Sequence, residues 1–405
     1  MLYQAYQSHA DIMGPLRSFA GMAARTVGAR LNGSARPSAL SSLTAAYELI
    51  ERAGLTHVRP PYGIEGVTVG ERDVAVTEEP ALVMPFGTLL HFRKDMDVAQ
   101  PRVLIVAPLS GHFATLLRAT VRTMLPEHDV YITDWHNARD VPAAAGAFGF
   151  DDYVAYLIRF LETIGPGAHL VAVCQPCVAA LVAASVMAQG GHPAQPRSMT
   201  LMAGPIDTRV NPTKVNELAK SKSIDWFERH LIARVPARYG GGGRRVYPGF
   251  VQLTAFMSMN IERHLKAHRD LYHHIAKGDE AKAAQTRAFY DEYFAVLDLT
   301  AAFYLETVRL VFQDHALPLG QLTYDNRKVE PAAIARTMLF TVEGEKDDIC
   351  AVGQTLAAHD LCSSLRPYRK RHHMQAGVGH YGVFSGKTWQ NQIYPMVKNV
   401  VLQSD

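Results

Sequence analysis

The feature that most limits the fold of this chain is a regular alternation of strand-type and helix-type runs. Residues 102–109 (RVLIVAPL), 129–135 (DVYITDW), 169–173 and 197–204 are short apolar strand-type runs, and alanine- or leucine-rich helical runs separate them. Strands that alternate with helices are joined by right-handed crossovers into a parallel sheet covered on both faces. The sequence therefore predicts an α/β fold with a mostly parallel sheet and helices on both faces.

This alternation is interrupted once. After residue 204 the chain carries long helical patterns rich in Phe, Tyr and Met around a glycine-rich stretch, YGGGGRR, and the alternation resumes with LFTVEGEKDDI. The simplest organisation is one α/β core with an inserted helical cap or lid. The predicted segments are an N-terminal helical segment 1–66, the first part of the core 67–204, the cap 205–324 and the second part of the core 325–405.

The part of the chain before the alternation has its own pattern. Residues 67–92 contain β-type runs broken by Gly, Pro and acidic residues, which predict a pair of antiparallel strands. Residues 1–55 have helical periodicity, and their apolar stripe is expected to pack on the rest of the domain, with a hydrophobic surface or partner as the alternative. The stripe consists of Ile12, Leu16, Phe19, Met22 and Ala23.

Composition limits the partners and the compartment. Hydrophobic residues make up 48% of the 405 positions, and 41 basic against 38 acidic residues leave a charge of only +3, so no nucleic-acid partner is expected. Four cysteines do not make a disulfide framework. The first residues lack a secretory pattern and no run is long enough for a transmembrane helix, so a cytoplasmic protein is expected. The oligomeric state is not indicated.

A cysteine occupies the corner between the strand at 169–173 and the helix that follows it. A sharp strand-to-helix turn lifts one side chain above the carboxyl edge of a parallel sheet, at the positive end of a helix. Ala172 is suitably small, and Pro176 suits a first helical turn. Cys174 is therefore a candidate nucleophile, with a buried apolar role as the alternative. Cys177 is expected to pack, although a C-x-x-C redox pair stays open.

Two further residues have the chain order of a nucleophile, acid and histidine triad. Asp347 follows the strand LFTVEG, where an orienting carboxylate belongs, and Asp348 is the alternative with a helix-capping role. His380 follows in the glycine-flanked loop GVGHYG. Together Cys174, Asp347 and His380 predict a base-assisted nucleophile, in which the histidine takes the thiol proton and the aspartate fixes its tautomer.

An acyl-transfer site also needs hydrogen-bond donors for an oxyanion. We expect one from the backbone NH of Gln175 and the other from Leu109 or Ser110, in the loop after the strand at 102–109. His112 lies close enough in sequence to reach the site, although a capping or solvent-exposed role is an equal alternative. The adjacent pairs at 273–274 and 372–373 resemble surface histidines, and no metal site is predicted.

Several strings together carry a family resemblance that covers nearly the whole chain. YQAYQSHADIMGPLRSFA, VAVCQPCV, EGEKDDICAVGQT and GVGHYGVFSG resemble intracellular polyhydroxyalkanoate depolymerases, which mobilise stored poly(3-hydroxybutyrate) granules. The resemblance implies an α/β-hydrolase fold with a cysteine nucleophile, and its triad falls on Cys174, Asp347 and His380. It also implies a cytoplasmic protein associated with the granule surface.

The resemblance also suggests how the substrate is held. An apolar polyester fits a cap rich in aromatic residues, of which some are expected to line the entrance. No cofactor is expected, but a thioester intermediate allows coenzyme A to replace water as acceptor. Arg244 and Arg245 are candidates for its phosphates, with a solvated loop as the alternative. The candidate substrate-binding aromatics are Trp226, Phe250, Phe256 and Tyr304.

Two other functions compete with depolymerisation. Polyhydroxyalkanoate synthases also use a cysteine in this fold, but glycines are expected around their nucleophile, where this chain has Ala172, Pro176 and Cys177. A catalytically inactive granule-coating protein would depend on the N-terminal apolar stripe and not on the triad.

Overall fold

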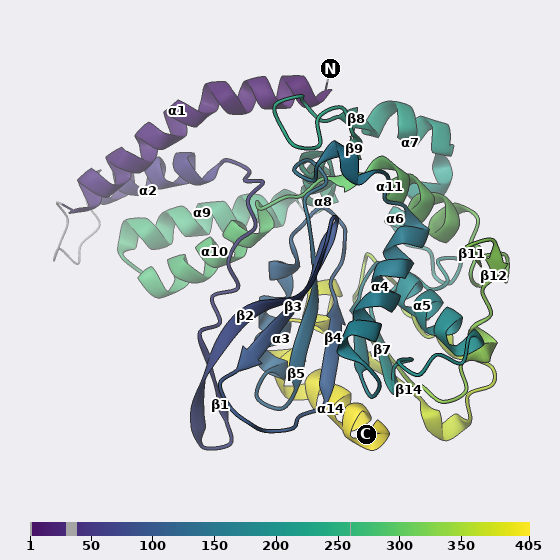
Figure 1. The fold of residues 1–405 in the computed structure, drawn as a ribbon. Coiled ribbons are helices and arrows are strands. Elements are labelled where there is room, and N and C mark those ends of the chain that lie inside the picture. The colour runs from purple at the N-terminus through teal and green to yellow at the C-terminus, as the bar shows by residue number, and fades with distance from the viewer. Residues whose placement is uncertain (1, 30–38, 260) are drawn as a thin grey trace.

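A nine-stranded sheet forms the centre of the computed structural model, which describes residues 2–29, 39–259 and 261–405 (Figure 1). Its strand order is β1-β2-β3-β5-β4-β6-β7-β13-β14. The strands are β1 Gly66–Val69, β2 Arg72–Met84, β3 Gly87–Lys94, β4 Arg102–Val106, β5 Asp129–Trp135, β6 His169–Val173, β7 Ser198–Met202, β13 Met338–Gly344 and β14 Lys370–Gln375. The predicted α/β class is confirmed.

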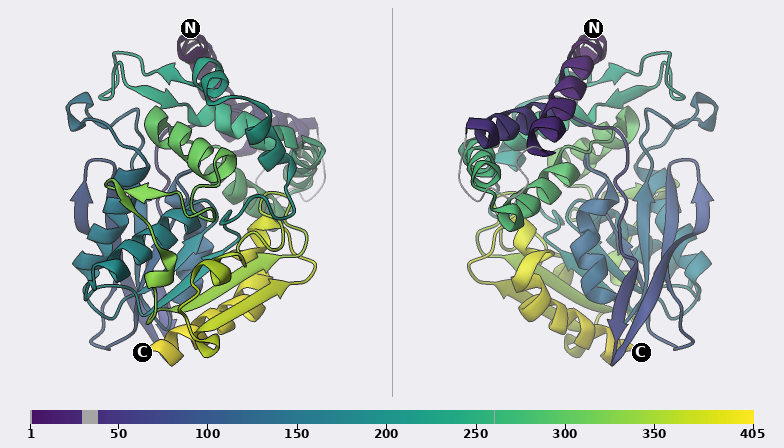
Figure 2. Two further views of the ribbon diagram at one scale, coloured as in Figure 1. Left: turned by 90° about the vertical axis from the view of Figure 1, so that its right-hand side faces the viewer. Right: turned by 90° about the vertical axis from the view of Figure 1, so that its left-hand side faces the viewer.

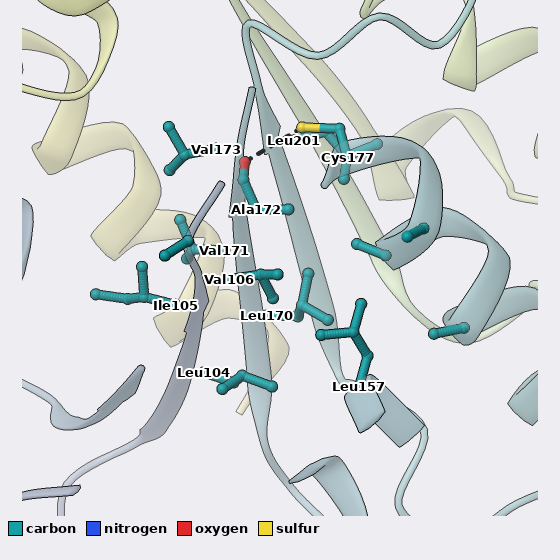
Figure 3. Close-up of a cluster of buried hydrophobic side chains, with 14 of the residues drawn as sticks. Leu104, Ile105, Val106, Leu157, Leu170, Val171, Ala172, Val173, Cys177 and Leu201 are labelled. Carbon is teal, nitrogen blue, oxygen red and sulfur yellow. Dashed lines mark hydrogen bonds between the residues drawn. The ribbon is translucent and has the colours of Figure 1, made fainter. Parts of the chain in front are cut away.

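The strands from β5 to β14 are parallel to one another. Every residue of β6, β7 and β13 is buried, which explains why these strands are nearly continuous apolar runs. Figure 3 shows the side chains of β4 and β6 packed together in this core. Residues 67–92 were predicted to form one pair of antiparallel strands, but this region contains three strands, β1, β2 and β3, each antiparallel to the next. Strand β3 also pairs antiparallel with β5 and so joins this region to the parallel part of the sheet.

Helices cover both faces of the sheet, with α4 and α5 on one side and α3 and α14 on the other (Figures 1 and 2). Right-handed crossovers produce this division, because the chain moves from β4 to β5 in one direction and from β5 through β6 to β7 in the other. Helix α5 is buried along almost its whole length. The helices are α3 Arg118–Met124, α4 Phe150–Ile164, α5 Cys177–Gln189, α12 Ala358–Leu361, α13 Gly386–Thr388 and α14 Tyr394–Ser404.

Between β7 and β13 the chain forms a helical layer above the sheet (Figure 1). It also contains two small antiparallel sheets, β8–β10 and β11–β12. The helices are α6 Lys214–Ser221, α7 Ile224–Leu231, α8 Gly249–Met259, α9 Ile261–Lys277, α10 Glu280–Tyr293 and α11 Ala301–Thr307. The short strands are β8 Ala233–Arg234, β9 Arg245–Tyr247, β10 Leu299–Thr300, β11 Thr323–Tyr324 and β12 Arg327–Lys328. The boundaries of the four predicted segments stay predictions.

Helices α1 (Leu2–Ala29) and α2 (Ala39–Arg52) form an N-terminal arm that extends beside α9 and α10 (Figure 1). An ion pair of 2.5 Å between Arg287 Nε and Glu48 Oε1 fastens α2 to α10. The expectation that the apolar stripe of α1 packs on the domain is wrong. Four of its side chains are exposed, and only Ala23 is half-buried. The exposed fractions are 74% for Ile12, 50% for Leu16, 58% for Phe19 and 56% for Met22.

The opposite face of α1 makes the contacts with the rest of the chain. Tyr3, Ala20, Gly21 and Ala24 are its buried residues, and the Tyr3 hydroxyl donates a hydrogen bond of 2.6 Å to Asp298. Small residues allow α2 to lie close, so the contact face is the less apolar one. No helix in the described part of the chain is long and apolar enough to cross a membrane.

Candidate active site

Cys174 lies at the corner where β6 ends, three residues before α5 begins. Its φ angle is 66°, in the left-handed region that a residue with a Cβ rarely adopts and that costs about 1–2 kcal/mol. The Cys174 NH is tied to the Met202 carbonyl of β7 at 2.8 Å, and its own carbonyl accepts from the Cys177 NH at 3.1 Å. Neighbouring strands thus hold a strained turn that leaves the thiol partly exposed.

Close packing behind the corner accounts for Cys177. This residue is completely buried, and its thiol lies 3.4 Å from the Ala172 carbonyl oxygen, as the dashed line in Figure 3 marks. A Cβ on Gly204 would lie only 2.2 Å from the Cys177 Cβ, so the chain after β7 passes directly against the start of α5. Burial raises the pKa of Cys177 well above its usual value. The thiol therefore packs as a neutral group.

Asp347 and His380 meet beside this corner. His380 Nδ1 lies 2.7 Å from Asp347 Oδ2, and both residues are buried. The other oxygen, Oδ1, accepts hydrogen bonds of 2.9 Å from the NH groups of Ile349 and Cys350, which fix the carboxylate. The alternative residue, Asp348, is exposed to solvent. The turn after β13 therefore presents Asp347 to the histidine.

The loops that carry the acid and the histidine are held together by the main chain. The Lys346 NH donates to the Val378 carbonyl at 2.9 Å. Gly344 is required at this point, because a Cβ there would lie 2.7 Å from the same Val378 oxygen. The two loops come from the ends of the adjacent parallel strands β13 and β14. Sheet topology thus joins residues 33 positions apart in the chain.

The electrostatics of His380 reflect two neighbours, Cys174 and Asp347. Burial lowers the pKa of His380, but its interactions with Cys174 and Asp347 outweigh burial and raise this pKa well above its usual value. Asp347 holds Nδ1, so Nε2 is the nitrogen left for the thiol. A thiolate and imidazolium pair oriented by a carboxylate can act as a nucleophile with its own acid and base.

The loop after β4 lies across from Cys174. Leu109, Ser110 and Gln175 line the same cavity as the cysteine. Among the described residues, no acceptor pairs with the backbone NH of any of the three. The loop is fixed at Gly111, whose φ of 92° and contact with Gln252 of α8 leave no room for a side chain. Free NH groups on both sides of a nucleophile are the arrangement that can hold an oxyanion.

The cavity around Cys174 has a volume of about 380 Å³ and lies between the sheet edge and the helical layer. This size is typical of a small-molecule site. Of the four predicted aromatics, Phe256 and Tyr304 lie in its wall. The other apolar side chains of the wall include Leu218, Phe227, Tyr247, Phe303 and Phe312.

The structure places the other two predicted aromatics outside the cavity wall. Phe250 is stacked on Tyr6 of the N-terminal arm, with ring centroids 3.9 Å apart. Trp226 is stacked on His230, one helical turn away on α7. Residue type alone selected these two rings, and it does not distinguish an aromatic that faces a cavity from one that joins two elements.

Arg244 and Arg245 are both engaged by the protein. Arg244 donates to the main-chain carbonyls of Ala138 and Pro142, at 2.9 and 2.8 Å. Arg245 forms an ion pair of 2.5 Å with Glu228. These contacts indicate a structural role for the two arginines of the glycine-rich loop. In the described ranges, no cluster of three His, Cys, Asp or Glu could hold a metal ion.

Two residues beside the candidate triad were not selected from the sequence. Tyr381 and Cys350 both line the cavity. Both could have been found from their neighbours in the sequence, because Tyr381 follows the candidate histidine and Cys350 lies three residues after the candidate acid. His112 also lies in the wall, stacked on Tyr293 with ring centroids 5.0 Å apart.

Comparisons with known proteins bear on the family and the fold. The family described as PHB de-polymerase C-terminus matches residues 203–405. The fold is similar to that of a soluble variant of monoglyceride lipase from Saccharomyces cerevisiae, with a TM-score of 0.50, 11% identity and coverage of 85% of this chain and 99% of that one. This likeness shows the α/β-hydrolase fold.

A carboxylesterase from Nitrososphaera gargenis is also similar, with a TM-score of 0.42, 12% identity and coverage of 84% of this chain and 100% of that one. No curated protein sequence matches the chain.

Proposed function

The chain belongs to the PHB depolymerase family and is a carboxylic ester hydrolase, and from this premise we propose that it cleaves stored poly(3-hydroxybutyrate) through Cys174, His380 and Asp347. One observation carries the proposal. A cysteine held at φ 66° in a strand-to-helix corner adjoins a histidine that is bonded to a buried carboxylate at 2.7 Å. Strained backbone positions of this kind cluster at active sites, so the exposed thiol beside such a pair supports a reactive role.

The first half-reaction transfers an acyl group to the cysteine. The Cys174 sulfur attacks an ester carbonyl carbon while His380 holds the thiol proton at Nε2. The negative charge that develops on the carbonyl oxygen is held by the backbone NH groups of Gln175 and of Leu109 or Ser110. The carbon–oxygen ester bond then breaks, and His380 gives its proton to the leaving alkoxide. The products are a polymer with a new hydroxyl end and a 3-hydroxyacyl thioester on Cys174.

The second half-reaction frees the enzyme. His380 takes a proton from water, the hydroxide attacks the thioester carbonyl, and the Cys174 thiolate leaves as a 3-hydroxy acid departs. A thiol can replace water here because a thioester exchanges readily with thiols, and coenzyme A would give a 3-hydroxyacyl thioester of that carrier. Neither route needs a cofactor. Arg244 and Arg245 are not assigned to coenzyme A, since protein groups already bind them.

The apolar stripe of α1 supports contact with the granule. Ile12, Leu16, Phe19 and Met22 present large apolar side chains to solvent at the end of the molecule opposite α14 (Figure 1). A contiguous exposed apolar patch of this kind marks an interaction surface. We assign it to the polyester surface of cytoplasmic granules, whose apolar chains would cover it.

Release of 3-hydroxybutyrate monomers and oligomers from amorphous granules tests the proposal. Native protein, Cys174→Ala and Cys362→Ala are compared with and without coenzyme A. The control removes a buried thiol that lies outside the cavity wall. Release by the native protein and the control, with none from Cys174→Ala, is expected, and the form of the product identifies the acceptor. Equal release from all three proteins would contradict the triad.

The same preparation separates the competing functions. Formation of polymer from 3-hydroxybutyryl-coenzyme A would favour a synthase. Binding to granules without any turnover would favour a coat protein.

A further inference from the structure

His112 has unmet hydrogen-bonding capacity in the wall of the cavity. It is 4% exposed, and within the described part of the chain its Nε2 atom is buried without a hydrogen-bond partner. A buried polar atom that stays unpaired costs about 1–3 kcal/mol. The Oε1 atom of Gln175, next to the cysteine, is a second buried acceptor without a partner. The wall that surrounds these two atoms is otherwise mostly apolar.

The surroundings of His112 hold the ring in place. The ring is stacked on Tyr293 and on Phe256, at centroid distances of 5.0 and 6.0 Å. The main chain at His112 is bridged to Val296, and the Leu297 NH donates to the Gly111 carbonyl at 3.0 Å. The ring is therefore anchored both to the loop after β4 and to the helical layer that forms the roof of the cavity.

The same surroundings determine which nitrogen carries the proton. The Tyr293 main chain acts on the ring as a hydrogen-bond acceptor that raises its pKa, and since Nε2 is unpaired, we assign this interaction to Nδ1. A carbonyl accepts, so Nδ1 carries the hydrogen. Burial, opposed by this carbonyl, lowers the pKa of His112 to about 4, and the ring is neutral at neutral pH. In a neutral ring with its hydrogen on Nδ1, Nε2 is only an acceptor.

An acceptor in this wall selects among the parts of a polyester. The ester groups along a poly(3-hydroxyalkanoate) chain offer only acceptors, and the carboxylate end does so as well. The hydroxyl end is the single donor. Resting on the proposed function, we infer that His112 binds the terminal 3-hydroxyl of the substrate, so that the site prefers the acyl unit at the hydroxyl end of a chain or oligomer.

Two matched oligomers test this inference. One is the 3-hydroxybutyrate trimer with a free hydroxyl end, and the other is the same trimer with that hydroxyl methylated. We expect kcat/KM of the native protein to favour the free trimer by about tenfold to a hundredfold, since a buried acceptor loses its only partner with the capped one. Equal rates on both trimers would overturn the inference, whereas failure to cleave either would overturn the proposed function with it.

Variants of His112 assign the preference to the ring nitrogen. His112→Phe keeps a ring for the stack but removes Nε2, so it should cleave both trimers at nearly the same rate. The matched control His273→Phe changes an exposed histidine of α9 and should keep the native preference. A preference retained by His112→Phe would overturn the inference.

A second pair of variants guards against a folding defect. His112→Gln can place an amide oxygen near the position of Nε2, whereas His112→Asn is shorter and places its amide near Nδ1. The expected order of preference for the free trimer is native, then Gln, then Asn, at equal melting temperatures. Equal preference in the Gln and Asn variants would contradict a role for Nε2.

Discussion

Helices α5 and α1 are both rich in apolar residues, and the protein uses them in opposite ways. Almost every residue of α5 is buried, which leaves it no polar face, and its first turn supports the Cys174 corner formed by residues 172–177. Helix α1 has an apolar stripe that faces solvent, while small residues such as Ala20 and Gly21 face the protein. Apolar periodicity thus identifies which residues share a face, but not what covers that face.

After the loss of the nucleophile itself, the greatest loss of activity is expected at the acid that orients His380. Asp347→Asn keeps the shape of the side chain but favours the wrong tautomer of the histidine, so kcat on soluble oligomers should fall about 10³- to 10⁴-fold. Asp348→Asn, a matched change one residue away at an exposed position, should leave kcat within about twofold. Equal losses in the two variants would remove the distinction between the buried and the exposed aspartate.

The same small substitution should act differently in the two regions. Gly204→Ala places a methyl group 2.2 Å from the Cys177 Cβ, and overpacking of this kind should lower the free energy of unfolding by about 1–3 kcal/mol. Gly28→Ala in α1 meets only the Thr44 methyl at 3.6 Å, and alanine favours a helix, so stability should stay level or rise by up to about 1 kcal/mol.

Urea unfolding of the two glycine variants measures both effects. A Gly204→Ala protein as stable as the native one would mean that the corner is not tightly packed.

The exposed arm should matter for the granule and not for the chemistry. Phe19→Glu places a charge on the apolar stripe and should reduce partition onto granules about tenfold, because roughly half of a phenylalanine's burial energy is lost. Leu402→Glu on α14 is the control, since Leu402 is 55% exposed against 58% for Phe19 but lies at the other end of the molecule. Granule sedimentation and oligomer turnover are measured together.

If Phe19→Glu and Leu402→Glu partition equally onto granules, the apolar stripe of α1 does not bind the granule surface. A loss of oligomer turnover in Phe19→Glu would instead mean that the arm supports the active site.

The smallest of these effects is a shift in the pKa of one histidine, His380. Cys174→Ala removes the side chain that raises the pKa of His380 and leaves burial to oppose Asp347 alone, so this pKa should fall. An NMR titration of the His380 ring follows the change, with Cys362→Ala as the control that should not move it. An unchanged or higher pKa in Cys174→Ala would mean that Cys174 and His380 do not interact.

Much of the core was predictable because its signals are local. Buried parallel strands must be short apolar runs, so β4, β5, β6, β7 and β13 were evident, and each loop after a strand indicated a candidate at the same sheet edge. The chain order of Cys174, Asp347 and His380 then required only the known direction of parallel strands. The pairing of Asp347 with His380 at 2.7 Å follows from the neighbouring positions of β13 and β14.

The rest depends on contacts between distant segments. Phe250 is stacked on Tyr6, which lies 244 positions earlier, and no local pattern distinguishes this contact from a place in the cavity wall. The unpaired nitrogen of His112 is visible only once Tyr293 and Phe256 are placed around its ring. The apolar stripe of α1 likewise faces solvent because α2 packs against the opposite face of the helix.

Mass spectrometry of the reacting protein would show whether Cys174 carries the acyl group during turnover. The native protein is mixed with an excess of oligomer, quenched in acid within its first turnovers and digested. We expect a 3-hydroxyacyl adduct on the peptide that contains Cys174, with no adduct at Cys177, Cys350 or Cys362. An adduct on another residue, or full turnover by Cys174→Ala, would contradict it.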